Sequence, residues 1–295
     1  MNKMDSAISQ ADYEYFNGAI KKHETQSSVL ISNSKYLNHA GLRSLIAQEY
    51  LRRNGADMPN TAFIPEVAKI LHELEDMPTV IRLFEEEKER LPEFKRWLTE
   101  RKLSNFTADD VKHCKEGTLG WILHDFIANS GYNIDVFFQG MPVVNDFTFY
   151  MKERAYTHDV EHMVSGFGPN HGGEVALIVA NMRAFYNYFR PELAAFFNRV
   201  PTYLLSKTMM KSGLYYPEGF KVELEAIEWG LKQGNNWKMP LMLVPWRDHI
   251  DRPIEEIREE FGVTPVIPDG YWDWTNSTSE DPREEPAASA SVAAE

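Results

Sequence analysis

The sequence predicts an all-α fold, a multi-helix bundle in which two of the helices are joined by a glycine-rich loop. Apolar residues recur at spacings of three and four along most of the chain, which is the period of an amphipathic helix. Sustained alternation of apolar and polar residues is missing, and so are hairpin dipeptides between β-branched runs. A chain of 295 residues is also long enough to bury a large core.

Four segments carry the helical period most clearly. In chain order they are SLIAQEYLRR, PEVAKILHELE, TVIRLFEEEKERLPEFKRWLTERK and EVALIVANMRAFYNYF. In each segment the apolar positions fall on one side of a helix, so we expect that side to pack against the other helices.

The chain divides into three predicted parts. Residues 1–61 are predicted to be a polar helical extension. Its end is placed at NGADMPNT, because this segment is rich in turn-forming residues and could link two domains. Residues 62–268 would form the main all-α domain. Residues 269–295 carry seven acidic residues and one basic residue. The low-complexity run that ends this stretch has almost no core-forming side chains, so a disordered acidic tail is expected.

Composition limits the classes of partner. The formal net charge of −13 does not suit the phosphates of nucleic acid.

The start of the chain lacks the basic and apolar regions of a signal peptide and carries acids that a transit peptide avoids. No apolar run approaches the ~20 residues of a membrane-spanning helix. We therefore expect a cytoplasmic protein with at most peripheral contact with the inner membrane. The single cysteine, Cys114, excludes an intrachain disulfide.

The most informative segment is residues 150–185. Its first part has a helical pattern up to about Ser165, and a new helix is predicted to begin at about Glu174. Turn-forming residues separate the two: Gly166, Gly168, Pro169, Gly172 and Gly173.

Four side chains of this segment form a candidate metal site. His158 and His162 are four residues apart, so they stack on one face of the first helix, and Asp159 lies one step round from it. Glu174 lies on the apolar stripe of the second helix and is therefore directed toward the core. Two imidazoles and two carboxylates suit zinc, manganese or ferrous iron better than calcium, with magnesium as a further alternative. A cation would also offset the cost of burying the carboxylates.

Simpler interpretations remain open at this point. A pair of histidines four apart is most often structural. Glu174 could be a carboxylate satisfied by backbone amides at the start of a helix. Asp159 could instead pair with Arg154 or Lys152 on the surface.

Three further residues show weaker patterns. His171, in the glycine-rich loop, is a secondary catalytic candidate that could move a proton. His124 lies in an apolar helix and is expected to be a core histidine. Glu161 lies on the far side of His158 from Asp159 and is expected to be solvated.

The stretch Ala184–Phe220 is dense in aromatic residues, leucine and methionine. Most of these side chains are expected in the core. Their surplus over what one helix face requires also suggests an apolar groove, in which the tail of a long-chain lipid could lie beside the metal.

Several motifs resemble one known family. HDVEHMVSGFGPNHGGE, from His158 to Glu174, is similar to the H-D-x-x-H-x(11)-E signature of the Coq-four family of ubiquinone (coenzyme Q) biosynthesis. EGTLGW, residues 116–121, and RPIEEIREEFGV, residues 252–263, resemble two further family elements. A late family segment is matched by Gly234, Lys238, Pro240, Leu241 and Trp246. The resemblance covers roughly residues 65–265, while the extension, the tail, His124 and Trp237 depart from it.

The resemblance implies an all-α fold, commonly a homodimer, with a divalent metal at His158, Asp159, His162 and Glu174. Zinc is the favoured ion, with iron, manganese and magnesium as alternatives. It also implies a metal-dependent lyase-like enzyme, a decarboxylase that replaces the carboxyl of a polyprenylated hydroxybenzoate ring by a hydroxyl. The partners would be a polyprenylated aromatic or isoprenoid lipid, a second copy of the chain, and peripherally a membrane or a biosynthetic complex.

Two other function classes remain as alternatives. One is a non-catalytic scaffold that binds an isoprenoid lipid for a quinone biosynthetic complex. The other is an HD-type phosphohydrolase, which needs additional distant ligands and lacks a glutamate after a glycine turn. The ring substitution and the chain length of the substrate are not determined by the sequence.

Overall fold

The computed structural model describes residues 33–55, 63–130 and 140–275. The chain forms two units, residues 1–44 and residues 45–295. The first unit contributes α2 (Lys35–Asn38) and the start of α3 (Ala40–Leu51) to the described residues. The second unit holds the remaining helices and the site described below.

Within the second unit the described elements are helical, which confirms the predicted fold class. Their bounds are α4 (Ile64–Glu73), α5 (Met77–Arg90), α6 (Pro92–Glu100), α7 (Ala108–Val111), α8 (Leu119–Ser130), α9 (Asp146–Ser165), α10 (His171–Tyr188), α11 (Pro191–Phe197), α12 (Arg199–Tyr215), α13 (Pro217–Asn236), the 3₁₀ turns η2 (Leu241–Leu243) and η3 (Trp246–Asp248), and α14 (Ile254–Phe261). The described residues contain no β-strand, only isolated bridges such as the one between Thr118 and Pro253.

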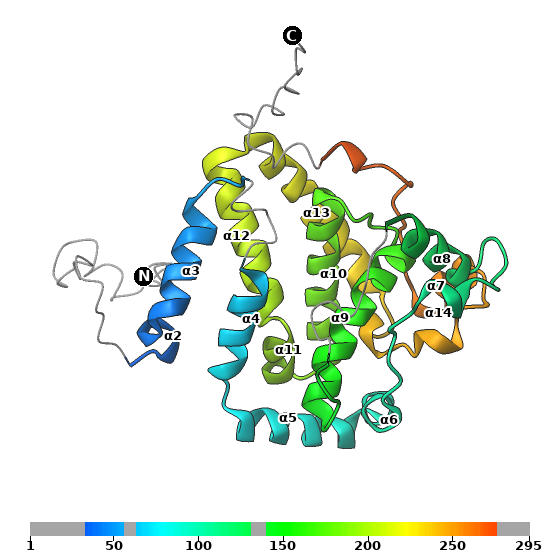
Figure 1. Cartoon of the computed structure of the whole chain (residues 1–295), viewed down its shortest axis with the longest axis horizontal. Helices are drawn as coiled ribbons and strands as arrows, with labels where there is room; N and C mark the ends of the chain where they lie inside the picture. The colour runs from blue at the N-terminus through cyan, green and yellow to red at the C-terminus, as the bar shows by residue number, and fades with distance from the viewer. Residues whose placement is uncertain (1–32, 56–62, 131–139, 276–295) are drawn as a thin grey trace, which may run out of the picture. The chain divides into compact units, whose positions relative to one another are not determined.

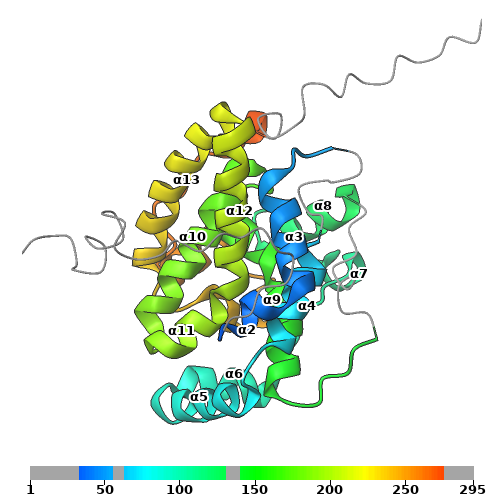
Figure 2. The same ribbon diagram turned by 90° about the vertical axis from the view of Figure 1, so that its left-hand side faces the viewer.

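The long helices α10 and α13 of the second unit run alongside each other (Figures 1 and 2). Gly230 and Gly234 of α13 face the backbone of α10, where a Cβ on either glycine would overlap carbonyl oxygens of Ala176 or Ala180. The absence of a side chain therefore permits close packing of the two helices. Around them a first core cluster joins α8, α9, α14 and the buried Trp246.

A second core cluster is mainly aromatic. It is built from α5, α6, α9, α10 and α11, with Phe84, Phe94 and Phe197 in mutual ring contacts near 6 Å. These tilted and edge-on contacts are the favoured geometry of packed aromatic rings. Most of the aromatic residues of the stretch 184–197 are therefore core residues.

The folded unit begins earlier than the boundary predicted at residue 62. Glu49, at the end of α3, is fully buried, and its carboxylate lies 2.8 Å from the Nζ atom of Lys207 on α12. Asn54 accepts a hydrogen bond of 2.8 Å from the Nζ atom of Lys211. Residues 45–55, which precede the predicted boundary, therefore belong to the same unit as α12.

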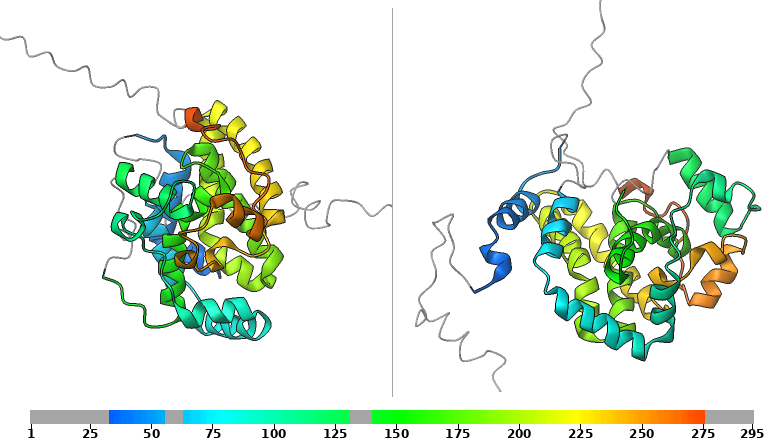
Figure 3. Two further views of the ribbon diagram at one scale, coloured as in Figure 1. Left: turned by 90° about the vertical axis from the view of Figure 1, so that its right-hand side faces the viewer. Right: turned by 60° about the horizontal axis from the view of Figure 1, so that its bottom comes forward.

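The unit also extends past the boundary predicted at Pro268. Trp272 is 2% exposed and packs on Phe167, and Thr275 is fully buried. In Figure 3 the orange and red segments carry α14 and the residues that lead up to Thr275. The predicted tail thus contributes to the core up to Thr275, and residues 276–295 lie outside the described residues. None of the described helices is both long and apolar enough to cross a membrane.

Candidate metal centre

The end of α9 and the start of α10 are set by local residues. Gly166 adopts a left-handed conformation (φ 77°) and ends α9, as glycine does most readily. Asn170 caps α10 by accepting a hydrogen bond of 2.8 Å from the amide of Gly173. Because of this cap, α10 begins at His171, three residues before the predicted start at Glu174.

The loop between the helices folds tightly onto the first turn of α10. A Cβ at Gly173 would overlap the backbone of Gly168, and a Cβ at Gly172 would overlap the ring of Trp272. The absence of side chains at these two glycines therefore lets the start of α10 pack closely on the loop and on Trp272.

Three of the four predicted ligands converge. The Nε2 atom of His162 lies 3.3 Å from Oε1 of Glu174, and Nε2 of His158 lies 3.4 Å from Oε2 of the same carboxylate. The two imidazole rings are 4.6 Å apart, in an edge-on arrangement. One donor atom of each of the three residues lies within 4.8 Å of the others. We call His158, His162 and Glu174 the α9–α10 trio.

The imidazole of His162 is oriented by the glycine-rich loop. Its Nδ1 atom lies 2.7 Å from the carbonyl oxygen of Phe167, which is an acceptor only, so Nδ1 carries the proton and donates. In this tautomer the lone pair is on Nε2. The Nε2 atom is buried and has no hydrogen-bond partner among the described residues.

Asp159 is placed differently from the other three. Its Oδ1 atom lies 3.2 Å from Nδ1 of His158, on the opposite side of that ring from Glu174. A carboxylate behind a metal-binding imidazole is the usual second partner of such a ligand. The geometry therefore shows a contact that positions His158, while the role of Asp159 as a fourth ligand stays a prediction.

The α9–α10 trio has a buried side and an open side. The side chain of His162 is 4% exposed, whereas those of His158 and Glu174 are 37% and 44% exposed. Burial lowers the pKa of His158, but the carboxylates of Glu174 and Asp159 outweigh burial and raise this pKa above its usual value. Burial raises the pKa of Glu174, but the two imidazoles hold it well below its usual value.

The trio fits a divalent ion. Two nitrogens and a carboxylate supply the mixed donor set that zinc, iron or manganese accepts. The nitrogen-to-oxygen distances of 3.3 and 3.4 Å are those between neighbouring ligands about 2.0–2.1 Å from a shared zinc ion. The exposed side leaves room for further ligands.

His171 lies away from the α9–α10 trio. Its Nε2 atom is 3.1 Å from Oε1 of the buried Glu223 on α13, and that carboxylate also accepts a hydrogen bond from Ser212 of α12. The geometry therefore supports a role for His171 in packing α10 on α12 and α13. His124 is half-buried on α8, so it is not fully enclosed in the core.

Glu161 is fully buried, so the prediction of a solvated side chain was wrong. Both carboxylate oxygens lie 3.2 Å from Nη1 of Arg154, and Asn181 donates a hydrogen bond of 2.8 Å from Nδ2. Two signals were present in the sequence: Arg154 is two helical turns before Glu161, and Asn181 lies on the same apolar stripe as Glu174.

Two of three comparisons with known proteins found relatives of this chain. The family model described as Coenzyme Q (ubiquinone) biosynthesis protein Coq4 matches residues 69–267, about two thirds of the chain. A crystal structure of a protein from Nostoc punctiforme PCC 73102, assigned provisionally to ubiquinone biosynthesis, is 27% identical with a TM-score of 0.55. The alignment covers 70% of this chain and 90% of that one. A search of the curated proteins gave no significant match.

The family model spans most of the second unit and includes all of the α9–α10 trio. On this match over more than half of its length, the chain belongs to the Coq4 family of coenzyme Q (ubiquinone) biosynthesis proteins.

Proposed function

We propose that this protein is a metal-dependent enzyme that carries out the oxidative decarboxylation of a polyprenylated hydroxybenzoate-type ring. Membership of the family implies involvement in ubiquinone biosynthesis. The metal, the reaction and the lipid substrate are the parts that we propose.

The observation that carries the proposal is the buried Nε2 atom of His162. That atom faces the carboxylate of Glu174 at 3.3 Å without the geometry of a hydrogen bond, and two acceptors this close repel each other unless a proton or a cation lies between them. Here the Nε2 lone pair points to the same region as the carboxylate of Glu174 and Nε2 of His158. A divalent ion, with zinc favoured and iron, manganese and magnesium as alternatives, would satisfy all three groups.

Such an ion supplies Lewis-acid polarisation and neutralises charge on an anionic head group. The protein orients the donors. Asp159 accepts from Nδ1 of His158, and the carbonyl of Phe167 accepts from Nδ1 of His162, so both Nε2 atoms face the ion. The Nε2 proton that the raised pKa of His158 favours without metal would leave when an ion binds. The half-exposed side chains of His158 and Glu174 leave the site open for the ring carboxylate or phenolate of a substrate.

The net reaction requires an oxidant. The bond between the ring and its carboxyl carbon breaks, carbon dioxide leaves, and water supplies the oxygen of the new ring hydroxyl. Two electrons and two protons are released, and dioxygen accepts them to become hydrogen peroxide. The reaction is thereby balanced with the substrate acid, water and dioxygen as reactants.

The lipid tail requires an apolar surface. Part of the stretch 184–220 that we expected to bind it is core, but other apolar side chains are exposed on α12 and α13. Met210 and Leu214 are 41% and 48% exposed, and Leu224 is 49% exposed. We propose that such exposed apolar side chains of α12 and α13 bind the polyprenyl tail, whose binding energy positions the head group.

The test combines metal analysis with turnover. Zinc, iron and manganese would be measured in the purified chain, and product formed from a polyprenylated hydroxybenzoate would be measured by mass spectrometry under air. We expect His162→Ala and Glu174→Gln to lose one equivalent of bound metal, the one held by the trio, together with all product while remaining folded, because each removes a ligand. The matched controls are His124→Ala and Glu228→Gln, which lie outside the trio and should keep both.

Two outcomes would overturn parts of the proposal. Full product yield in Glu174→Gln would refute a catalytic metal at the trio. Loss of metal with retained complementation of a ubiquinone-deficient strain would support the alternative, a non-catalytic scaffold that binds isoprenoid lipid.

A further inference from the structure

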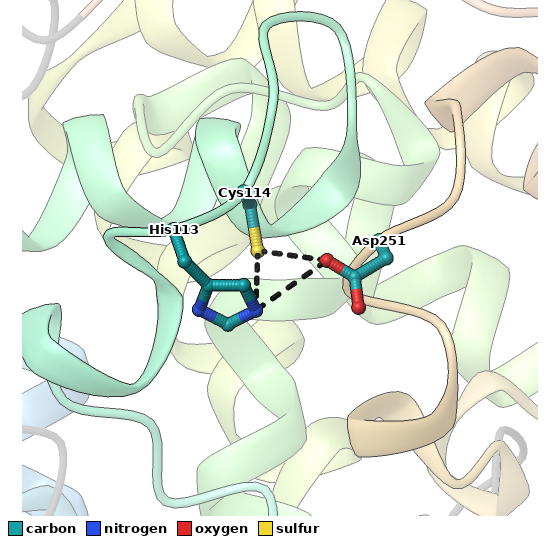
Figure 4. Close-up of side chains that lie close together, drawn as sticks. All are labelled: His113, Cys114 and Asp251. Carbon is teal, nitrogen blue, oxygen red and sulfur yellow. Dashed lines mark hydrogen bonds and ion pairs between the residues drawn. The ribbon is translucent and has the colours of Figure 1, made fainter.

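A second group of metal-binding side chains lies outside the α9–α10 trio. It consists of His113 and Cys114, in the segment between α7 and α8, and Asp251, in the turn before α14 (Figure 4). The Sγ atom of Cys114 lies 3.8 Å from Nε2 of His113 and 3.5 Å from Oδ1 of Asp251. The Nε2 atom of His113 lies 3.5 Å from the same Oδ1 atom.

These three distances match one tetrahedral ion. With a zinc–sulfur distance of about 2.3 Å and zinc–nitrogen and zinc–oxygen distances of about 2.0–2.1 Å, neighbouring ligand atoms lie about 3.3–3.6 Å apart. The observed separations of 3.5, 3.5 and 3.8 Å would therefore need shifts of only a few tenths of an ångström. One thiol, one imidazole and one carboxylate also form a donor set that zinc accepts.

The backbone holds the two segments together without any ion. Leu119 donates a hydrogen bond of 3.0 Å to the carbonyl of Arg252, and Gly120 donates one of 2.8 Å to that of Ile250. Ile254 in turn donates to the carbonyl of Gly117 at 3.1 Å. These bonds flank Asp251 on both sides, so the ligands are brought together before an ion arrives. Such preorganisation lowers the entropic cost of binding.

The three side chains also differ in exposure in a way that suits an ion entering from solvent. Cys114 is buried, whereas the side chains of His113 and Asp251 are 57% and 71% exposed. The sulfur would thus form the base of the site, and the two exposed ligands would close over the ion. Water can take the fourth position on the open side.

We propose that His113, Cys114 and Asp251 bind a divalent ion of the zinc class through Nε2, Sγ and a carboxylate oxygen, with water as fourth ligand. This site is separate from the proposed function and contains the only sulfur ligand that a cysteine of this chain can offer. The thiol proton leaves to solvent when the zinc–sulfur bond forms, and no electrons are transferred.

Protons compete with the ion at this site. An ordinary cysteine thiol is protonated at neutral pH, and the thiolate is the form that binds metal. Metal binding must therefore release this proton, and affinity should rise with pH. A hydrogen bond from the thiol to Asp251, with no affinity for metal, is the competing description of the same geometry.

Cobalt(II) distinguishes the two descriptions, because a thiolate bound to cobalt gives a near-ultraviolet charge-transfer band that nitrogen and oxygen ligands do not give. The purified full-length chain would be stripped of metal and titrated with cobalt(II). Because Cys114 is the one cysteine, any such band reports this site. We expect the band in the wild type, its absence in Cys114→Ser, and competition by zinc.

The exposed ligands supply the decisive variants, because their substitution leaves the core intact. His113→Ala and Asp251→Asn should each weaken cobalt affinity at the band by at least about tenfold, since loss of a direct ligand should exceed the cost of losing an outer contact. Glu174→Gln is the matched control and should keep the band unchanged. The band therefore reports this site even if the α9–α10 trio binds no metal.

Two results would overturn the proposal. One is the absence of a thiolate band in the folded wild type at saturating cobalt. The other is a band whose cobalt affinity is the same in His113→Ala, Asp251→Asn and the wild type. Thermal unfolding of the metal-free proteins would show that each variant is folded.

Discussion

The imidazoles of the α9–α10 trio are each held by one acceptor. Phe167 provides a backbone carbonyl for His162, and Asp159 provides a carboxylate for His158. Both contacts use Nδ1 and so leave Nε2 for a ligand. Because a carboxylate is a stronger acceptor than a carbonyl, Asp159 should increase the basicity of Nε2 in His158.

The contact of Asp159 leads to a prediction at the scale of one residue. Asp159→Asn keeps an acceptor for His158 but removes its charge, so metal affinity should fall by at least about tenfold while the protein stays folded. Affinity would be measured by zinc competition against a chromogenic chelator, with Cys114→Ser in every protein compared so that the second proposed site does not contribute. Asp109→Asn is the control, because the side chain of Asp109 is 88% exposed and remote in sequence from the trio. A complete loss of metal, equal to that in Glu174→Gln, would instead identify Asp159 as a direct ligand.

At the scale of elements, two contacts between helices differ in kind. One joins α10, which carries Glu174, to α13, and the other joins α3 to α12. The close approach of α10 and α13 depends on Gly230 and Gly234. The attachment of α3 to α12 depends on the buried pair Glu49 and Lys207. The first contact is steric and the second is electrostatic, so they respond to different substitutions.

Gly230→Ala tests the steric contact. The added methyl group would overlap the backbone of α10 at Ala176, and relief requires the helices to separate. We expect the free energy of unfolding to fall by about 1–3 kcal/mol, the usual cost of overpacking. Gly213→Ala on α12 is the control, because a Cβ there meets no atom within 4 Å and should raise stability by about 0.5–1 kcal/mol. Urea unfolding measures both, and equal effects would contradict the steric argument.

Glu49→Gln tests the electrostatic contact. The substitution removes the carboxylate that neutralises the buried ammonium of Lys207, and breaking a buried pair in this way typically costs about 3–5 kcal/mol. Glu73→Gln is the comparison, because Glu73 pairs with Lys69 on the surface and such pairs contribute about 0–1 kcal/mol. Urea unfolding of both variants gives the two values. A loss in Glu49→Gln no larger than that in Glu73→Gln would show that Lys207 is otherwise stabilised.

At the scale of the whole molecule, the buried carboxyl of Glu153 links folding to pH. Burial raises its pKa to about 8, although hydrogen bonds from the amide and hydroxyl of Ser104 act in the opposite direction. The pKa in the unfolded chain is about 4.3. Between these values the folded state binds more protons than the unfolded state, so this group lowers stability as pH rises from about 4.3 to 8.

Glu153→Gln should remove this dependence. A neutral amide has no proton to lose, so the variant should gain stability relative to the wild type as pH rises from 5 to 8, by an amount on the order of a few kcal/mol. Denaturant unfolding at both pH values measures the difference between the two proteins. Glu228→Gln, at an exposed position of α13, should show no such change. A constant difference between Glu153→Gln and the wild type at both pH values would show that Glu153 ionises normally in the folded protein.

The sequence by itself determined the all-α class, the glycine-rich turn and the shared face of His158 and His162. These features depend on contacts three to five residues apart, which helix geometry and glycine conformation fix locally. The resemblance to the family was likewise visible in the sequence, because several family motifs occur in it in the family's order.

Only the tertiary structure decided which distant groups meet. Lys207 lies 158 residues from Glu49, and Asp251 lies 137 residues from Cys114, so no local period could pair them. Neighbouring helices also fix the side-chain torsions of His171 and Asp159. As a result His171 contacts Glu223, and Asp159 contacts Nδ1 of His158. The physical reason is that local geometry gives a side chain its direction from the helix axis, whereas its partner is set by the packing of helices far apart in the chain.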